Sequence, residues 1–109
     1  MGTKKPKTTG CRQFFGKFDD AKAFLRDEFA LGRPVRVSRL NLKDAGDCDL
    51  INGHFYIRID RKLCEDVAIL ILFHEWSHAL SWKDTRRHDH GQAWGKAYSK
   101  VWSRWVGER

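Results

Sequence analysis

The stretch His74-Glu75-Trp76-Ser77-His78 holds two imidazoles and a carboxylate at the spacing that zinc hydrolases use. On an α-helix, residues four apart lie nearly above one another, so the rings of His74 and His78 can reach one ion. Glu75 lies about 100° around the helix from His74, too far for a third ligand but near enough to reach a water on the ion. The pattern predicts a zinc-activated water that attacks a carbonyl, with Glu75 as general base.

The surroundings of this motif favour a metal site over a chance match. Segment 67–73 is an unbroken apolar run, and apolar or small residues occupy every side of a helix drawn over 67–80. A helix that is apolar all round is predicted to be buried. Burying two imidazoles and a carboxylate without partners is costly, and a bound cation removes most of that cost. The alternative is a core helix whose histidines are satisfied by hydrogen bonds.

A third zinc ligand must come from another segment, because a catalytic zinc site has three protein ligands and one open position. The polar stretch 83–87 is predicted to be a loop, and a further helix is predicted to begin at residue 91. His90 is the preferred ligand because it immediately precedes that helix and can be aimed by it. His88 and Asp89 remain open as substitutes, and His54 is a more distant one.

The run from residue 70 to 94 resembles the SprT-like zinc metallopeptidases, which include the Spartan proteases and small phage-encoded relatives. In that family an H-E-x-x-H helix is followed, after a loop, by H-G-x-x-[FW]; here the second motif is His90-Gly91-Gln92-Ala93-Trp94. The resemblance covers residues 54–105. It implies a zinc-dependent metallopeptidase in which His74, His78 and His90 bind one catalytic Zn²⁺ and Glu75 is the base. The chain departs from larger members in lacking their paired-cysteine zinc ribbon.

Length and composition favour one small domain. The chain has 109 residues, 41% of them hydrophobic, which is enough for a modest core. Cys11, Cys48 and Cys64 are odd in number and not closely paired, so neither a disulfide framework nor a second zinc site is expected, and a reducing compartment is favoured. No secretory signal or apolar run of ~18 residues is present. We expect a soluble, monomeric, cytoplasmic protein without membrane contact, found in the host cytoplasm if it is phage-encoded.

The elements expected around the motif form an α+β, minimal zincin-like fold. Residues 1–12 are predicted to be a disordered basic arm, and 13–109 the SprT-like zinc metallopeptidase domain. Helices are expected over 18–31, 65–82 and 91–105. Strands are expected over 35–42, 48–51 and 54–60, the last two joined by Asn52-Gly53, a strong hairpin signal. Together the strands are expected to form a three-stranded antiparallel sheet.

The last helix and one strand carry further expectations about the site. An apolar stripe on the last helix is predicted to be core: Trp94, Ala97, Tyr98, Val101, Trp102 and Trp105. Tyr98 alone among them has a polar tip that can face the zinc and steady an oxyanion. A protein or peptide substrate is expected to pair as an added strand with residues 54–60 or with the strand next to them.

The net charge of +7 raises a second class of function. Basic residues in the arm, in the loop before His90 and on the last helix can follow a phosphate backbone: Lys4, Lys5, Lys7, Lys83, Arg86, Arg87, Lys96, Lys100 and Arg104. The alternative is an ordinary solvated surface. Spartan-like relatives act on DNA-bound proteins, so the resemblance implies DNA-associated substrates and non-specific nucleic-acid contact. The competing hypothesis is a catalytically silent zinc fold that serves as a basic nucleic-acid- or protein-binding module.

Overall fold

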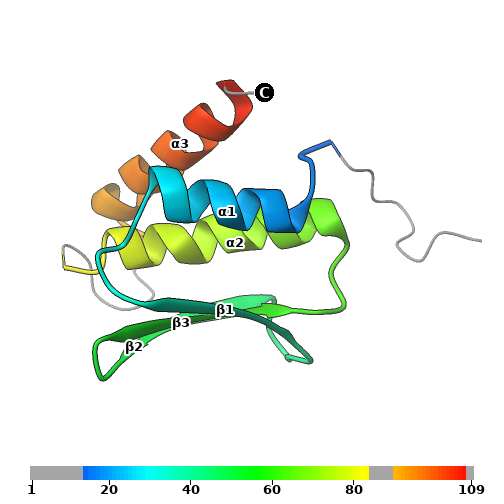
Figure 1. Ribbon diagram of the computed structural model, residues 1–109, viewed down its shortest axis with the longest axis horizontal. Helices are drawn as coiled ribbons and strands as arrows, with labels where there is room; N and C mark the ends of the chain where they lie inside the picture. The colour runs from blue at the N-terminus through cyan, green and yellow to red at the C-terminus, as the bar shows by residue number, and fades with distance from the viewer. Residues whose placement is uncertain (1–13, 84–89, 108–109) are drawn as a thin grey trace, which may run out of the picture.

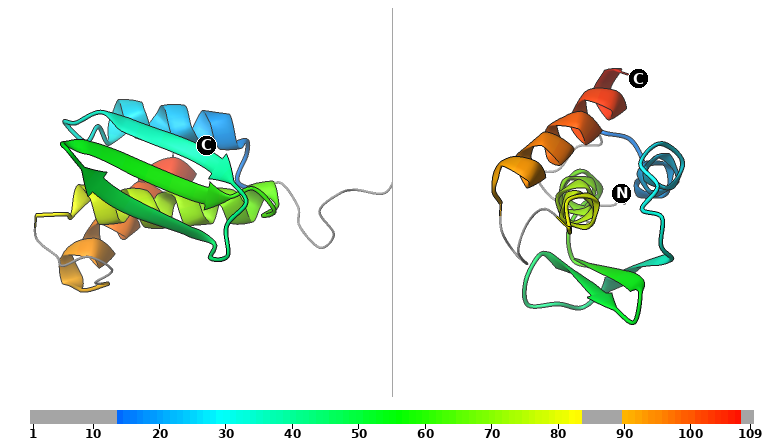
Figure 2. Two further views of the ribbon diagram at one scale, coloured as in Figure 1. Left: turned by 90° about the horizontal axis from the view of Figure 1, so that it is seen from below. Right: turned by 90° about the vertical axis from the view of Figure 1, so that its left-hand side faces the viewer.

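The computed structural model describes residues 14–83 and 90–107, which form a compact α+β fold of three helices and a three-stranded mixed sheet. The predicted arm 1–12 lies outside the described residues. One face of the sheet is covered by the second helix, and the first and third helices pack on that helix from the other side (Figure 1). Viewed along the second helix, the first and third helices lie on either side of it (Figure 2). The elements are α1 Phe18–Glu28, β1 Val35–Leu40, β2 Gly46–Ile51, β3 His54–Asp60, α2 Glu65–Leu80 and α3 Gln92–Gly107.

The sheet differs from the antiparallel one expected. Its order is β1-β3-β2, with β2 antiparallel and β1 parallel to β3. The central place goes to β3 because Phe55, Ile57 and Ile59 make its inner face fully apolar and buried. Segment 41–45 therefore has to cross the end of β3, roughly two strand spacings or about 10 Å, which five residues span easily. With both sides of β3 paired, the expectation that residues 54–60 receive a substrate strand is wrong, whereas the neighbouring β2 lies at an edge.

The hairpin between β2 and β3 is confirmed. Asn52 has φ 50° and Gly53 φ 80°, the left-handed pair that a two-residue type I′ turn requires. β2 begins at Gly46, two residues earlier than expected. At this residue the chain passes close to Ile71 of α2. A Cβ atom on Gly46 would lie 2.7 Å from Cγ2 of Ile71 and 2.8 Å from the Arg58 carbonyl oxygen, so only glycine fits there.

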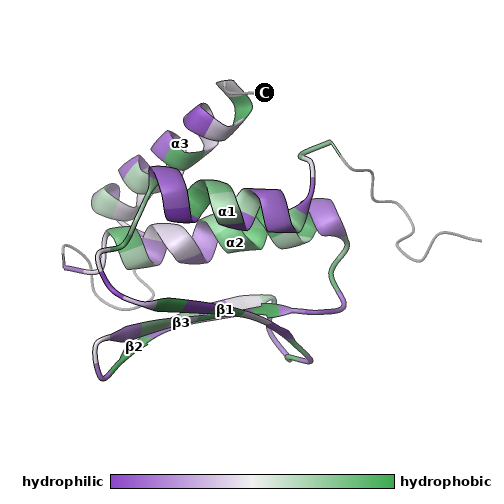
Figure 3. Cartoon of the chain, in the orientation of Figure 1, coloured by the Kyte–Doolittle hydropathy of each residue, from purple (hydrophilic) through white to green (hydrophobic). Residues whose placement is uncertain are grey.

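Helix α2 forms the centre of the core and is the most continuously apolar helix in Figure 3. Its first turn holds the chain that precedes α1: the Asp66 carboxylate accepts hydrogen bonds from the Phe14 and Phe15 amides at 2.8 and 3.0 Å. Near its other end the Trp76 indole donates to the Phe29 carbonyl at 2.9 Å. Both ends of the motif-bearing helix are thereby fixed. No helix within the described ranges is long and apolar enough to cross a membrane.

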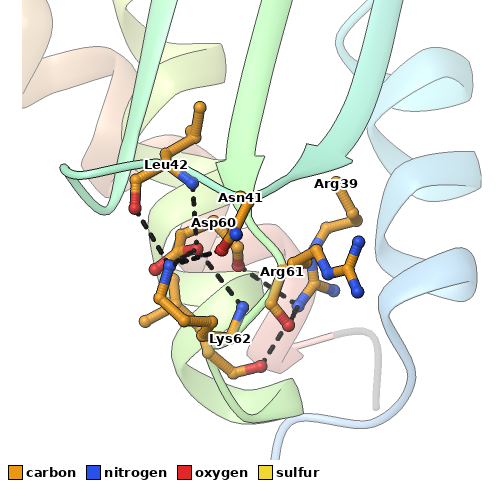
Figure 4. Close-up of polar contacts among 7 residues, drawn as sticks. Arg39, Asn41, Leu42, Asp60, Arg61 and Lys62 are labelled. Atoms are coloured by element: carbon orange, nitrogen blue, oxygen red, sulfur yellow. Dashed lines mark hydrogen bonds and ion pairs between the residues drawn. The ribbon is translucent and has the colours of Figure 1, made fainter.

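A polar cluster, the corner cluster, fixes the turn between β3 and α2 (Figure 4). The Asp60 carboxylate accepts from Lys62 Nζ at 2.9 Å and from the Leu42 amide at 3.3 Å. The Lys62 contacts hold the pKa of Asp60 below its usual range. Arg39 donates to three backbone carbonyls of the turn, at 3.1 Å to Leu63 and 3.4 Å to Asp60 and Arg61. The start of α2 is therefore set by the Asp60–Lys62 pair and by Nη2 of Arg39, while the buried Nε of Arg39 makes no hydrogen bond.

The cysteines depart from the expectation of unpaired thiols. Cys64, directly before α2, is disulfide-bonded. Cys48 on β2 is free and buried, and burial raises the pKa of its thiol far above the usual range. Cys48 is therefore a neutral core residue rather than a reactive thiolate.

Candidate metal centre

Three histidines from two segments converge at one point. His74 and His78 lie one turn apart on α2, and His90 lies just before α3. Nε2 of His90 is 3.0 Å from Nε2 of His74 and 3.1 Å from Nε2 of His78. Within residues 14–83 and 90–107 this is the one group of three or more histidine, cysteine or acidic side chains close enough to hold a metal ion. The preferred third ligand, His90, is thus brought to the pair on α2.

Hydrogen bonding among the three rings cannot account for this arrangement. A neutral imidazole nitrogen either donates one proton or accepts at one lone pair, so Nε2 of His90 can satisfy one of its two neighbours but not both. Three nitrogens bound to a tetrahedral zinc ion at ~2.0–2.1 Å lie about 3.3 Å apart. The two separations that involve His90, 3.0 and 3.1 Å, are close to that value. The donor set therefore fits a single small cation with nitrogen preference.

The environment of His74 favours the form that binds metals. Burial, and secondarily the neighbouring His90, hold the pKa of His74 below its ordinary value. The ring is therefore neutral at physiological pH, as a metal-ligating imidazole must be. His78 is more deeply enclosed, with 6% of its surface exposed, whereas His90 lies at the exposed rim. The cluster is open to solvent on the His90 side.

Trp94 on the first turn of α3 holds the three rings together. Its ring centroid lies 4.7 Å from that of His90, 5.0 Å from His74 and 5.7 Å from His78. Its indole nitrogen also donates to the His74 carbonyl at 3.1 Å. Trp94 thus ties the start of α3 to the middle of α2. The sequence interpretation placed Trp94 in the core; the spacing of four between His90, Trp94 and Tyr98 is the signal that pairs it with the metal cluster.

Tyr98 divides the aromatic stripe of α3 into two parts. It stacks on Trp94 with centroids 4.7 Å apart and planes at 15°, and its ring lies 6.2 Å from His74. Farther along, Val101 and Trp105 are buried in the core, as predicted. The first half of the stripe thus belongs to the histidine cluster and the second half to the core.

Glu75 is buried, with 8% of its surface exposed, and lies close enough to Asp47 and Cys48 of β2 to interact with them electrostatically. Burial, and secondarily the charge of Asp47, raises the pKa of Glu75 from 4.5 to about 7. The charge of Glu75 in turn contributes to the raised pKa of Cys48. Among the hydrogen bonds of the described residues, none involves this carboxylate. A buried carboxylate without such bonds is costly to the fold, which is typical of a functional group.

The other predicted residues are not part of the cluster. His54 lies exposed on β3, with its ring 6.4 Å from that of Tyr56, and does not join the three histidines. The substitutes His88 and Asp89 lie outside the described residues, as do the arm lysines, Arg86 and Arg87. Arg104 pairs with Glu28. Lys96 and Lys100 line an open cavity of about 530 Å³ between α2 and α3, which also includes Leu80 and Phe29.

No protein-family model matches the sequence, and no curated protein matches it either. The interpretation of the site therefore depends on its own geometry and chemistry.

Proposed function

We propose that this protein is a zinc-dependent metallopeptidase of the SprT-like kind, with a minimal zincin-like fold. The observation that carries the proposal is the convergence of three imidazole nitrogens, one of them on the residue that directly precedes the buried Glu75 in α2. His74, His78 and His90 would hold Zn²⁺. When bound, zinc supplies Lewis acidity to a water and to the substrate carbonyl. A purely structural zinc site favours four protein ligands and has no use for a carboxylate between two of them.

Glu75 would act as the general base. It follows His74 directly on α2, so the two side chains leave the helix about 100° apart and can approach the same ion from different sides. Its carboxylate is buried near β2, which limits its contact with bulk water. Its role is to accept the proton of the attacking water and to pass it to the leaving amine.

Strand β2 would position the substrate. It is the edge of the sheet next to α2, and Asp47 and Cys48 on it lie close to Glu75. An extended peptide that pairs with the free side of β2 would therefore pass over the histidine cluster. Protein segments that are already unfolded, including segments of DNA-associated proteins, fit such an edge best because they offer unpaired backbone groups.

The experiment is proteolysis of an unfolded protein, such as casein, by the purified full chain loaded with one equivalent of zinc. Glu75→Gln is expected to lower turnover by about 10²–10⁴-fold, because it keeps the shape of the side chain but removes the base. Zinc content and circular dichroism should stay as in the unaltered chain. Glu28→Gln, an exposed glutamate on α1, is the matched control and should cleave normally.

Equal turnover by Glu75→Gln and Glu28→Gln would exclude Glu75 from the reaction. Absence of any cleavage by the zinc-loaded chain across several unfolded substrates would overturn the peptidase assignment itself.

A further inference from the structure

The side of α2 that carries the histidines also carries its exposed apolar residues. The sequence predicted that this helix is buried all round, yet Val67 and Leu70 are 40% and 39% exposed. They are the two large apolar residues of α2 with this degree of exposure, whereas Ile69, Leu72 and Phe73 are fully buried. Within the described part of the chain, the helix is therefore covered by the sheet, α1 and α3, and Val67 and Leu70 stay exposed along one side.

The uncovered side leads directly to the metal centre. At 100° per residue, Val67 lies about 20° from His74 around the helix axis, and Leu70 about 40° from it on the other flank. Along the axis, Leu70 is about 6 Å and Val67 about 10 Å from His74. Side chains on one face of an extended peptide repeat every ~7 Å. A peptide whose carbonyl reaches the histidine cluster therefore brings a nearby side chain over Leu70.

Two elements border this side. On one flank, β2 begins at Gly46, whose backbone packs against Ile71. On the other flank lies α3, where Trp102 packs edge-on against Phe73 with centroids 4.7 Å apart. The exposed surface of Val67 and Leu70 is therefore a strip between the edge strand and α3, continuous with the histidine cluster.

The direction of β2 decides which part of a peptide lies on the strip. Gly46, its first residue, contacts Ile71 near the start of α2, while Leu50 shares a cavity with Ala79 and Leu80 at the end of α2. β2 and α2 thus run in the same direction. A peptide paired antiparallel to β2, the more stable arrangement, runs the opposite way. Its residues after the cleaved bond then lie over Leu70 and Val67.

We propose that Val67 and Leu70 form a subsite that selects an apolar side chain on the C-terminal side of the cleaved bond. This proposal rests on the proposed function and adds the class of substrate residue that the site prefers. An apolar side chain fits because the strip presents aliphatic surface that the fold leaves in water.

The test uses two dipeptides that carry a hydroxamate at their N-terminal end, so that they bind zinc without being cleaved and extend to the C-terminal side of the site. One carries an isobutyl side chain next to the hydroxamate and the other a carboxymethyl side chain. With zinc-loaded full chain, calorimetry is expected to give about tenfold tighter binding of the isobutyl probe. Leu70→Asp should reduce this preference to less than twofold. Leu40→Asp changes a leucine of similar exposure, 43%, on β1 and should keep the preference.

The outcomes separate the two proposals. Equal binding of both probes by the unaltered chain, or an equal preference in Leu70→Asp and Leu40→Asp, would overturn the subsite while leaving the zinc site intact. Binding of neither probe would overturn the zinc site and the subsite together. Val67→Asp, compared with Val106→Asp on α3, gives a second matched pair should Leu70→Asp fail to fold.

Discussion

Two polar clusters lie at opposite ends of α2, and they differ in how their members are satisfied. In the corner cluster, the Asp60 carboxylate meets the Lys62 ammonium, and Arg39 meets backbone carbonyls. Donors there face acceptors. In the metal centre, three imidazoles face one another, and one ring nitrogen has two neighbours that it cannot satisfy together. The first cluster is held by donor–acceptor pairs within the chain, with Nε of Arg39 as the one buried side-chain nitrogen or oxygen of the described residues that lacks a hydrogen bond, whereas the second has the arrangement that would hold a cation.

This difference assigns different roles to the two clusters. The corner cluster sets where α2 starts, which fixes the positions of residues further along the helix. The metal centre joins α2 to the start of α3 through His90 and Trp94. If the difference holds, changes in the corner cluster should affect the fold, and changes in the metal centre should affect a bound ion.

The largest effect is expected from His78→Ala. It removes one of three ligands, and the loss in zinc affinity should exceed the ~10–100-fold typical of losing a residue that only orients a ligand. Elemental analysis should give about one equivalent of zinc for the unaltered chain and almost none for the variant. Zinc at 100 times its dissociation constant should stabilise the unaltered chain by about 2.7 kcal/mol but not the variant. Full zinc content in His78→Ala, with His54→Ala as control, would contradict the assigned ligands.

An effect of comparable size is expected from Glu75→Gln in metal-free protein. Because burial raises the pKa of Glu75 from 4.5 to about 7, the folded state favours the protonated acid. That stability is fully present below pH ~4.5 and is lost as the pH rises through ~7. The advantage of the glutamine variant should therefore grow by about 3 kcal/mol between pH 4.5 and 8. Urea unfolding in a chelator at several pH values measures it, and a difference that does not change with pH would argue against a buried, ionisable Glu75.

A substitution in the corner cluster should lower the free energy of unfolding without changing zinc binding. Arg39→Met removes the donor to the carbonyls of the turn before α2 and should cost about 1.5 kcal/mol of unfolding free energy. Zinc per folded molecule should not change. Arg36→Met, an exposed arginine of the same strand, is the matched control and should have little effect. A loss of zinc from folded Arg39→Met protein would mean that the two clusters are not separate in function.

The smallest effect is expected from Trp94→Phe. Phenylalanine keeps a ring against the histidines but removes the hydrogen bond to the His74 carbonyl. A net loss near 1 kcal/mol corresponds to about fivefold weaker zinc binding. Trp82→Phe, which alters a ring packed on Phe55, should leave zinc affinity unchanged. Competition with a chromophoric chelator resolves such a difference, and equal affinities for both variants would remove Trp94 from the support of the site.

Local patterns accounted for much of this structure. The spacing of His74 and His78 and the Asn52-Gly53 turn depend on neighbouring residues, and the structure contains both. The first helix was expected over 18–31, but it ends at Glu28, three residues earlier. The parallel pairing of β1 with β3 could not be obtained in this way, because a hairpin signal does not say on which side a third strand joins.

The sequence also could not predict which side of α2 is exposed to solvent. Val67 and Leu70 are as apolar as the buried residues beside them, so their exposure depends on how β2 and α3 are placed. His90 was found from its place before a helix, but the role of Trp94 depends on the angle at which α3 meets α2. Tertiary placement of this kind is not encoded in the periodicity of a single helix.

The most direct test of the account is zinc-edge X-ray absorption spectroscopy on the purified, zinc-loaded chain. We predict a four-coordinate ion with three imidazole nitrogens and one light ligand from solvent, all at ~2.0–2.1 Å. A first shell that contains sulfur, or one filled by four protein side chains, would contradict the claim that three histidines hold an ion with one position left for catalysis.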